Sequence, residues 1–537
     1  MQPVFNAAPV SVNQPNQIVH YKNKTNDMKT ITSALTALML LSACAAFTQP
    51  GSLDSSFGSN GKVVKPTGSA GTFDHSLAIQ QDGKIIVTGT SFNGINNDVI
   101  LVRYKLNGSL DKSFGVNGIT VTDLGSGEGG NAVAVQTDGK ILVTGNSVLL
   151  RYRSNGLPDS SFGAYGKIYI PITGNCVAVQ ANGKILVGGN GGDCGTPGGC
   201  VSVARYNTVG SADSSFGTDG IVSIDITDPP EHFGHGIATS ITILQKGKIL
   251  LAGNNYDEGP GSGIVIARFT RDGKVDSSFG QIHQNSIFKE ECYSVGIQSN
   301  GKILLAGTGT GYLSINGWDF DLRRLNPDGS FDTNFGTGGI VRTDFNYWDF
   351  GKALRIQPDG KILIAGYTSS NNSDYNFALA RYKSNGRLDK TFGIKGKVIT
   401  QLDGEDYAYS IALQQDGKIV VGGSSGTKFA LVRYDGDTVL LNNNTDDIAS
   451  NIISLYPSAG LKIYPNPVES ILNIEFNKIG AVQKRINIFD VNGKLLISKL
   501  CDGNTALNVK QLIAGTYLIK MNDENGKELY NGKVIKQ

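Results

Sequence analysis

The sequence predicts an all-β protein, a seven-bladed β-propeller followed by a small Ig-like β-sandwich at the C-terminus. Three observations predict it. A block of about 57 residues recurs seven times, each block holds four short β-branched runs, and 70 of the 537 residues are Gly, as in turn-dense chains. A fixed period of this length marks one supersecondary unit repeated in space. Four antiparallel strands per unit are typical of one propeller blade.

Each block carries three elements in a constant order: Ser-Phe-Gly or a close variant, Gly-Lys-Ile, and Arg followed by Tyr, Phe or Leu. We expect the Phe to be wedged between blades and the Arg to make a polar contact from one blade to the next. The positions are Phe57, Phe114, Phe162, Phe216, Phe279, Phe335 and Phe392, with Arg103, Arg151, Arg205, Arg268, Arg324, Arg381 and Arg433.

The second block illustrates the strands, which we call a to d and assign to one blade. The runs 119–122, 132–136, 140–144 and 147–152 are apolar and β-branched, with no helical periodicity. Asp138-Gly139 lies between runs b and c. Asp-Gly between two such runs predicts a tight hairpin with a primed turn, which needs positive φ.

The N-terminal segment has the pattern of an export signal. Met28-Lys29-Thr30 is followed by an apolar run over 31–41 and then by small residues. We therefore predict a signal peptide over 28–48, cleaved after Ala45 or Thr48, and a preceding extension, 1–27, that is not translated. The alternative is a lipobox ending at Cys44, which would be acylated. The propeller is expected over 49–436.

The C-terminal region changes in composition. Residues 437–460 are rich in Asn and Asp, lack the repeat and are predicted to be a linker. Residues 461–537 hold alternating strands joined by Asn-Gly-type turns, which predicts the β-sandwich.

This C-terminal block resembles the type A sorting domain of the type IX secretion system of Bacteroidetes-type bacteria. The motif residues, in order and spacing, are Tyr464, Pro465, Asn466 and Pro467, then Asp490, Gly493 and Lys494, then Gly515, Tyr517 and Lys520. The propeller blocks resemble the delta-60 repeat family. The first resemblance implies that the type IX machinery is a partner and that the protein is secreted or attached to the outer cell surface. The second implies an architecture and no activity.

Charge and cysteine content exclude some functions. Residues 49–460 carry 34 basic and 38 acidic side chains, a net charge of −4, which offers no footprint for nucleic acid. No apolar run in the mature chain reaches about 18 residues, so no transmembrane segment is expected. Cys194 and Cys200 flank a Gly-rich loop and are a candidate disulfide in an oxidising exterior. Cys176, Cys292 and Cys501 are expected to be small apolar residues in or beside strands.

Topology narrows the search for a site. The b–c turns and d–a connections share one face of the disc and are uniform, whereas the a–b and c–d loops share the other face and differ in every blade. Loops on a rigid scaffold usually carry binding. On that variable face we predict a ligand-binding patch around the two Trp residues of the chain: Trp318, Trp348, Tyr347, Asp349, Tyr312 and Tyr367. Aromatic rings among Asp and Asn suit sugars. The alternative is that these rings pack the loops onto the disc.

No catalytic residue, metal site or cofactor is assigned. A cluster in the fourth block has a loose His-x-x-His spacing and is interpreted as a solvated loop; its residues are Asp225, Asp228, Glu231, His232 and His235. The predicted function is non-catalytic binding or adhesion to a glycan or other polymer. The alternatives are a secreted glycan-degrading enzyme and a structural surface-coat protein.

Overall fold

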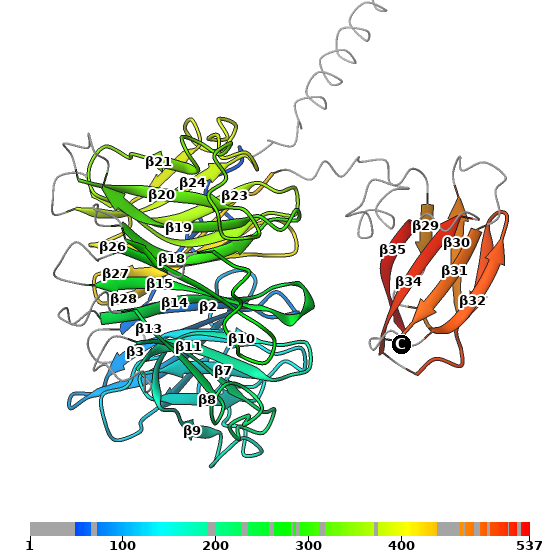
Figure 1. Ribbon diagram of the computed structural model, residues 1–537, viewed down its shortest axis with the longest axis horizontal. Coiled ribbons are helices and arrows are strands. Elements are labelled where there is room, and N and C mark those ends of the chain that lie inside the picture. Colours follow the sequence, from blue (N-terminus) through cyan, green and yellow to red (C-terminus); the bar gives the residue numbers. More distant parts are fainter. Residues whose placement is uncertain are drawn as a thin grey trace, which may run out of the picture. The chain divides into compact units, whose positions relative to one another are not determined.

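The structure is a computed structural model, shown in Figure 1. It describes residues 49–65, 72–191, 200–226, 235–256, 263–280, 283–285, 290–310, 317–369, 374–437, 461–464, 468–476, 484–490, 495–513, 515–523 and 528–536. These residues form seven four-stranded antiparallel sheets and a two-sheet C-terminal unit. The predicted fold class is therefore confirmed.

Every blade is a four-stranded meander, ordered from its innermost strand outward. Blade 1 contains β2 (Thr72–Ile79), β3 (Ile85–Phe92), β4 (Asn97–Tyr104) and β5 (Ile119–Thr122). Blade 2 contains β6 (Ala132–Val135), β7 (Ile141–Gly145), β8 (Val148–Tyr152) and β9 (Lys167–Tyr169). Blade 3 contains β10 (Ile172–Val179), β11 (Ile185–Gly191), β12 (Cys200–Tyr206) and β13 (Ile221–Asp225). Blades 4 and 5 contain β14 (His235–Ile243), β15 (Ile249–Tyr256), β16 (Gly263–Phe269), β17 (His283–Asn285); and β18 (Glu290–Ile297), β19 (Ile303–Thr310), β20 (Trp318–Leu325), β21 (Ile340–Thr343). Blades 6 and 7 contain β22 (Asp349–Ile356), β23 (Ile362–Ser369), β24 (Tyr375–Tyr382), β25 (Lys397–Thr400); and β26 (Asp406–Leu413), β27 (Ile419–Ser425), β28 (Lys428–Tyr434), β1 (Lys62–Lys65).

Blade 7 closes the ring by combining both ends of the propeller sequence. Its outermost strand, β1, pairs with β28 in the register Lys62 to Val432. Its innermost strand, β26, contacts β2 of blade 1, as every innermost strand contacts the next. The ring thus leaves no open edge between its first and last blades, which removes the usual template for aggregation.

The sequence repeat and the structural blade are offset by one strand, which corrects the assignment of runs a to d to one blade. Run a of the second block is β5, and it pairs with β4 of the first block in the register Val102 to Ile119. The reason is local. The connection over 105–118 folds into short turns that return the chain antiparallel along β4, whereas run b lies across a loop that crosses to the next blade.

The Asp-Gly turns also differ from the prediction. In the Asp82-Gly83 pair of the first block only Gly83 has positive φ, at 79°, and its N–H donates to Gln80 O at 2.9 Å. The Asp82 carboxylate accepts the Lys84 N–H at 3.2 Å. This is the pattern of a type I turn followed by a Gly in the left-handed region. The backbone of Asp82 keeps negative φ, and its side chain caps the turn.

The repeated Phe and Arg residues join neighbouring blades, as predicted. All seven Phe side chains are 0–5% exposed. Each Arg guanidinium lies 4.3–4.7 Å from the centroid of one Phe ring, which is the next repeated Phe in the sequence for six of them and Phe57 for Arg433, where the ring closes. Arg151, for example, pairs with Asp159 at 2.8 Å and donates to Thr208 O of the next blade. We call this arrangement the Arg–Asp–Phe latch.

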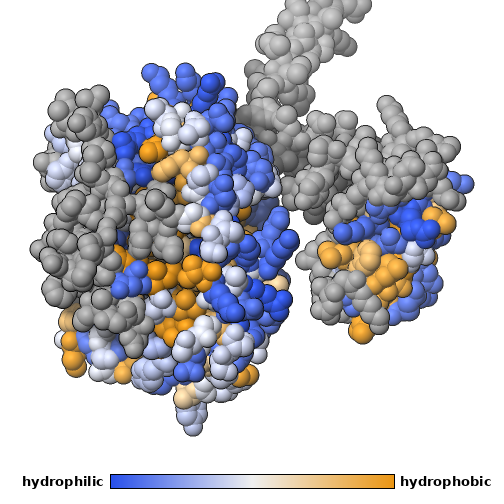
Figure 2. Space-filling model, in the orientation of Figure 1, coloured by the Kyte–Doolittle hydropathy of each residue, from blue (hydrophilic) through white to orange (hydrophobic). Residues whose placement is uncertain are grey.

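The C-terminal unit is a sandwich of two antiparallel sheets. One contains β29 (Leu461–Tyr464), β30 (Ile471–Phe476) and β33 (Thr505–Asn508), and the other β32 (Leu495–Cys501), β31 (Lys484–Phe489), β34 (Gly515–Asp523) and β35 (Glu528–Lys536). Tyr517, Ile519 and Met521 alternate into the core. Figure 2 shows apolar surface on this unit, where Leu495, Leu496 and Leu500 of β32 are exposed.

Among the sorting-motif residues, Tyr517 is buried and its hydroxyl donates to Ile513 O at 2.7 Å, so it holds the sandwich together. Asp490, Gly515 and Lys520 lie at the surface or are half-buried. Tyr464 ends β29. Pro465, Asn466, Pro467, Gly493 and Lys494 lie outside the described residues, as do 1–48 and 438–460, to which the leader and most of the linker were assigned.

The structure moves the boundary between the propeller and the linker by one residue. Asp437, assigned to the linker, pairs with Arg381 at 2.8 Å and Lys361 at 2.7 Å and so belongs to the propeller.

Cys200 is disulfide-bonded, while its predicted partner Cys194 lies outside the described residues. Cys176, Cys292 and Cys501 carry free thiols. Within the part of the chain that the structure describes, no helix is long and apolar enough to cross a bilayer.

Candidate binding site on the variable face

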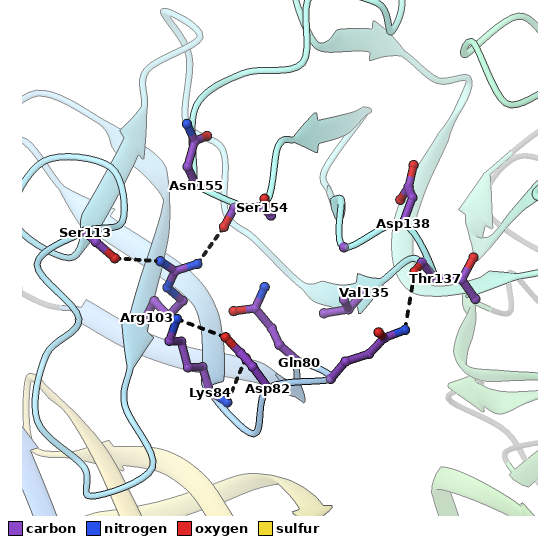
Figure 3. A pocket seen from close by; sticks show the side chains of 12 residues that line it. Gln80, Asp82, Lys84, Arg103, Ser113, Val135, Thr137, Asp138, Ser154 and Asn155 are labelled. Carbon is purple, nitrogen blue, oxygen red and sulfur yellow. Dashed lines mark hydrogen bonds and ion pairs between the residues drawn. The ribbon is translucent and has the colours of Figure 1, made fainter. Parts of the chain in front are cut away.

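The uniform face holds a pocket at blade junctions. Figure 3 shows the one between blades 1 and 2, about 480 Å³ in volume, where Arg103 lies beside Lys84, Ser113 and Ser154. A pocket of about 440 Å³ occupies the corresponding position between blades 5 and 6, with Arg324 in place of Arg103. A feature that recurs with the repeat belongs to the scaffold, and it does not distinguish one site from the others.

On the variable side, the innermost strands carry a β-bulge. The register slips by one residue in β2, β10, β14, β18, β22 and β26. A bulge re-aims one side chain. By alignment of the blocks the re-aimed residues are Asn175, Thr239, Tyr293, Lys352 and Tyr409, with Asn131 at the corresponding position before β6; the side chain at this position in β2 lies outside the description.

Several of these bulge residues contact the next innermost strand. The Asn131 amide donates to Gly174 O at 3.0 Å, and the Thr239 hydroxyl donates to Cys292 O at 2.7 Å. Lys352 Nζ lies 3.5 Å from the centroid of the Tyr293 ring. The bulge position therefore carries Asn, Thr, Tyr or Lys in different blades while the backbone stays the same.

Blades 5 to 7 gather aromatic rings at the variable ends of their strands, a group we call the aromatic row. Trp318 stacks with Phe350 at 6.2 Å between centroids, Phe350 stacks with Tyr367 at 5.0 Å, and Tyr367 meets Tyr407 edge-on at 5.0 Å. Tyr375 and Tyr409 complete the row, each within 6.5 Å of Tyr407. All six rings are half-buried, so each keeps some area open to solvent.

A cation and hydrogen-bonded tyrosines extend the aromatic row towards blade 4. Lys352 Nζ lies 5.6 Å from the Phe350 centroid and 5.7 Å from that of Tyr367. Burial lowers the pKa of Lys352 to about 8, and Glu291 opposes the change. The Tyr293 hydroxyl donates to Glu291 at 2.5 Å, and burial raises the pKa of Tyr293. The ammonium group thus lies over the faces of three aromatic rings.

Three carboxylates lie beside the aromatic row, at the junction of blades 5 and 6. One oxygen from each of Asp319, Asp344 and Asp349 lies within 4.8 Å of the other two. Burial, reinforced by the charge of Asp344, raises the pKa of Asp319 to about 6. Burial also raises the pKa of Asp349 to about 7, although hydrogen bonds from Phe345 N and Thr368 work against it. We call this group the carboxylate trio.

The structure places most of the predicted patch in one area. Trp318 and Trp348 are both half-buried, and the Trp348 indole packs on Gly317, where an added Cβ would lie 2.1 Å from its Cδ1. Tyr347 is 40% exposed and Tyr367 lies in the middle of the aromatic row. Asp349 lies beside the patch but is fully buried, beneath the surface that a ligand would touch.

Other predicted positions fall away from this area or outside the description. Tyr312 lies outside the described residues, as do Asp228, Glu231, His232 and the side chain of His235. Asp225 ends β13 and is exposed. The described residues contain no group besides the carboxylate trio in which three His, Cys, Asp or Glu ligand atoms converge.

Sequence reasoning missed Tyr293, Phe350 and Lys352. A signal for Tyr293 and Lys352 exists in the repeat itself. The residue just before the run of the Ala-Val-Ala-Val-Gln type is His, Asn, Thr, Tyr or Lys in different blocks, while the second and fourth positions of that run are always aliphatic. Aligning the seven blocks against one another would have marked this position as one that the scaffold leaves free to vary.

Comparison with protein families divides the chain into two matched regions. A model described as a domain of unknown function (DUF5122) beta-propeller matches seven segments, and a model described as a secretion system C-terminal sorting domain matches residues 462–537. The seven segments are 80–114, 136–162, 180–216, 247–279, 298–335, 357–392 and 414–437. No curated protein matches the sequence.

Solved structures show similarity at low sequence identity. A catalytically inactive virginiamycin B lyase from Staphylococcus aureus, solved with quinupristin, is 12% identical with a TM-score of 0.40, covering 69% of this chain and 98% of its own. Sqt1 from Chaetomium thermophilum is 12% identical with a TM-score of 0.40, covering 73% and 99%. A protein of unknown function from Bacteroides caccae is 14% identical with a TM-score of 0.33, covering 62% and 100%. These values carry no inference about activity.

Proposed function

We propose that the propeller of this chain binds a glycan or related polymer outside the cell without cleaving it. Seven segments of the chain match the DUF5122 β-propeller model and its C-terminal residues match a secretion system sorting domain, so the protein is secreted or exported to the cell surface. The sorting domain is recognised by the secretion machinery. The propeller is the cargo, so the binding function is assigned to its variable face.

The aromatic row is the observation that carries this proposal. Six half-buried rings from three blades make a continuous surface in which neighbouring centroids are 5.0–6.4 Å apart. Sugar rings offer an apolar face that stacks on aromatic rings and hydroxyls that pair with nearby polar groups. Glu291 and Glu405, which accept hydrogen bonds from Tyr293 and Tyr407, supply such groups.

The alternative of a glycan-degrading enzyme rests on the carboxylate trio, because raised carboxylate pKa values are typical of catalytic acids. Burial argues against that role for two of its members. Asp349 is fully buried with both oxygens accepting hydrogen bonds, and Asp319 is 9% exposed. A glycosidic oxygen has to reach the acid that protonates it, and only Asp344 of the trio is exposed. The coat-protein alternative predicts no ligand at all.

The test is a binding screen with the full chain on an array of bacterial, plant and algal polysaccharides, followed by the double variant Trp318→Ala/Trp348→Ala. Each stacked ring contributes about 1 kcal/mol, so losing two should weaken binding of the array hit at least tenfold. Trp318→Phe/Trp348→Phe keeps two rings and should retain most of the affinity.

Tyr169→Ala is the matched control, since Tyr169 is 68% exposed on the outermost strand of blade 2 and should leave binding unchanged. If no polysaccharide binds, or if the Ala double variant lowers the melting temperature by several degrees while a bound polysaccharide keeps its affinity, the Trp residues serve packing and the proposal is wrong. Release of new reducing ends from a bound polysaccharide would favour the enzyme instead.

A further inference from the structure

The carboxylate trio is assembled from three strand ends at one blade junction. Asp319 is the second residue of β20, Asp344 directly follows β21, and Asp349 is the first residue of β22. The first two strands belong to blade 5 and the third to blade 6, so the backbone of the propeller fixes the meeting point. One oxygen from each side chain lies within 4.8 Å of the others.

Asp319 provides a second, separate observation. Its side chain is 9% exposed, and no described residue donates a hydrogen bond to it or pairs with it as an ion. The nearby cations are engaged elsewhere. Arg342 pairs with Glu290 at 2.9 Å and Asp321 at 3.2 Å, and Lys397 donates to the Asp344 carbonyl. A carboxylate that has lost most of its water and has no partner in the protein is left incompletely solvated, and a bound cation would supply the missing interaction.

Hydrogen bonds hold the Asp349 carboxylate in a fixed orientation. Asp349 accepts the Phe345 N–H and the Thr368 hydroxyl, each at 2.5 Å, one on each oxygen. These bonds fix the orientation of the carboxylate and leave lone pairs on both oxygens. Outer hydrogen bonds of this kind typically orient metal ligands.

The geometry points to a divalent cation site formed by Asp319, Asp344 and Asp349, with Ca²⁺ as the ion of matching size. Ca²⁺ holds oxygen ligands at about 2.3–2.6 Å, so one ion spans oxygens up to about 5 Å apart, whereas Mg²⁺ spans only about 4.2 Å and demands stricter geometry. Asp344 is exposed, which leaves the ion accessible to water and to a ligand hydroxyl.

The site also adjoins the aromatic row in sequence. Trp318 and Trp348 directly precede Asp319 and Asp349. A cation joining these two aspartates would tie both Trp-bearing segments to one point. The cation site does not depend on the proposed polymer binding, because the carboxylates and their surroundings are sufficient to hold it.

The repeat supplies an internal control. Asp98, Asp123 and Glu128 occupy the corresponding positions at the junction of blades 1 and 2. There each carboxylate accepts at least one hydrogen bond from the protein, although Glu128 Oε2 is buried without a partner in the described part of the chain. Asn93 donates to Asp98 at 3.2 Å, Gly125 N donates to Asp123 at 2.8 Å, and Ser126 donates to Glu128. The same backbone positions therefore carry acids in both places. Asp344 and Asp349 also accept hydrogen bonds from the protein, Asp344 from Asn346 N and Asp349 from Phe345 N and Thr368. Asp319 is the one of these six carboxylates that has no donor among the described residues.

Isothermal titration of CaCl₂ into chelator-treated full chain tests the proposal, with thermal melts in parallel. We expect one Ca²⁺ per chain with a Kd of about 0.1–1 mM, as in extracellular modules with few charged ligands, and a melting temperature that rises with Ca²⁺ concentration. Asp319→Asn and Asp344→Asn should each weaken binding at least tenfold, while Asp98→Asn should keep the wild-type affinity. MgCl₂ should bind more weakly than CaCl₂.

Asp344 is exposed, so Asp344→Asn reports on the site even if the buried substitution disturbs folding. Absence of Ca²⁺ binding by the wild-type chain overturns the site. Binding that survives Asp344→Asn, or that Asp98→Asn abolishes, overturns its location. No polysaccharide is present in these measurements. Their result therefore neither supports nor contradicts the proposed polymer binding.

Discussion

The two faces of the propeller use the same residue types in opposite ways. On the uniform face each blade junction repeats the Arg–Asp–Phe latch, with the Asp side chains 2–9% exposed and an Arg at 2.6–2.9 Å. On the variable face no described Arg pairs with the buried Asp319, Asp349 or Asp406, and the acids that do have Arg partners there, Asp321 and Glu290 in blade 5, form one local cluster with Arg323 and Arg342 that does not recur in the described parts of the other blades. The difference shows that one face carries the stability of the ring and leaves the other free to be shaped for binding.

The pKa values of buried aspartates differ in direction between the two faces. For Asp159, burial alone would raise the pKa, but hydrogen bonds from Ser161 and the charge of Arg151 outweigh it and lower the pKa to about 2. For Asp406, burial is the largest effect and raises the pKa, because the opposing hydrogen bonds come without a nearby cation. The charged form of Asp is therefore stabilised on one face and penalised on the other.

The largest expected effect is acid unfolding, which acts on all the latches together. A carboxyl whose folded pKa lies below its unfolded value of 3.8 contributes stability above that pH, and loses it as the pH falls through the folded pKa. We expect the urea midpoint of the full chain to drop steeply between about pH 4 and pH 2. A midpoint that stays level over this range would show that the latches do not carry the ring.

Breaking a single latch should have the next largest effect. Arg151→Ala leaves Asp159 buried without its partner and removes the cation over Phe162, which should cost about 3–5 kcal/mol in the free energy of unfolding. Urea unfolding measures this change. Arg153→Ala is the control, since Arg153 is exposed and makes one long contact to Ser160. Equal losses in the two variants would refute the comparison between faces.

A smaller effect is expected when the variable face is neutralised. Asp406 is fully buried with a raised pKa, so its contribution to stability is present below about pH 3.8 and is lost as the pH rises through the folded pKa. Asp406→Asn removes the titrating group, so relative to wild type its free energy of unfolding should be higher at pH 7 than at pH 4. If thermal melts show the same pH dependence as wild type, the burial argument fails.

The smallest effect is expected at the exposed turns of the uniform face. Asp138 is exposed, and its pair with Lys140 at 3.4 Å is open to solvent. Asp138→Asn keeps an acceptor for the Lys140 N–H and should change the free energy of unfolding by less than about 0.5 kcal/mol. A loss above 1 kcal/mol would mean that the turns, and not the latches, hold this face.

The repeat made much of this structure predictable. Blade number, the buried Phe, the Arg contact and the sorting sandwich all follow from residues that recur or match at fixed spacing, because a unit repeated seven times must solve one packing problem in one way. The offset between repeat and blade was not predictable from spacing alone. Run a has comparable sequence distances to both neighbours, and hydrogen bonding through the short 105–118 connection decides which strand it joins.

The site was only partly visible in the sequence. Composition by itself directed attention to Trp318 and Trp348, since the rarest large rings fall in adjacent irregular loops. Tyr293 and Lys352 acquire their place from a β-bulge, and a bulge is a property of two paired strands that no single run of residues encodes. The convergence of Asp319, Asp344 and Asp349 likewise exists only once β20, β21 and β22 end at one junction. The sequence by itself determined the ring and the export route, because these rest on repetition and local motifs. The tertiary structure decided which side chains meet at the variable face, because those contacts join strands from different blades.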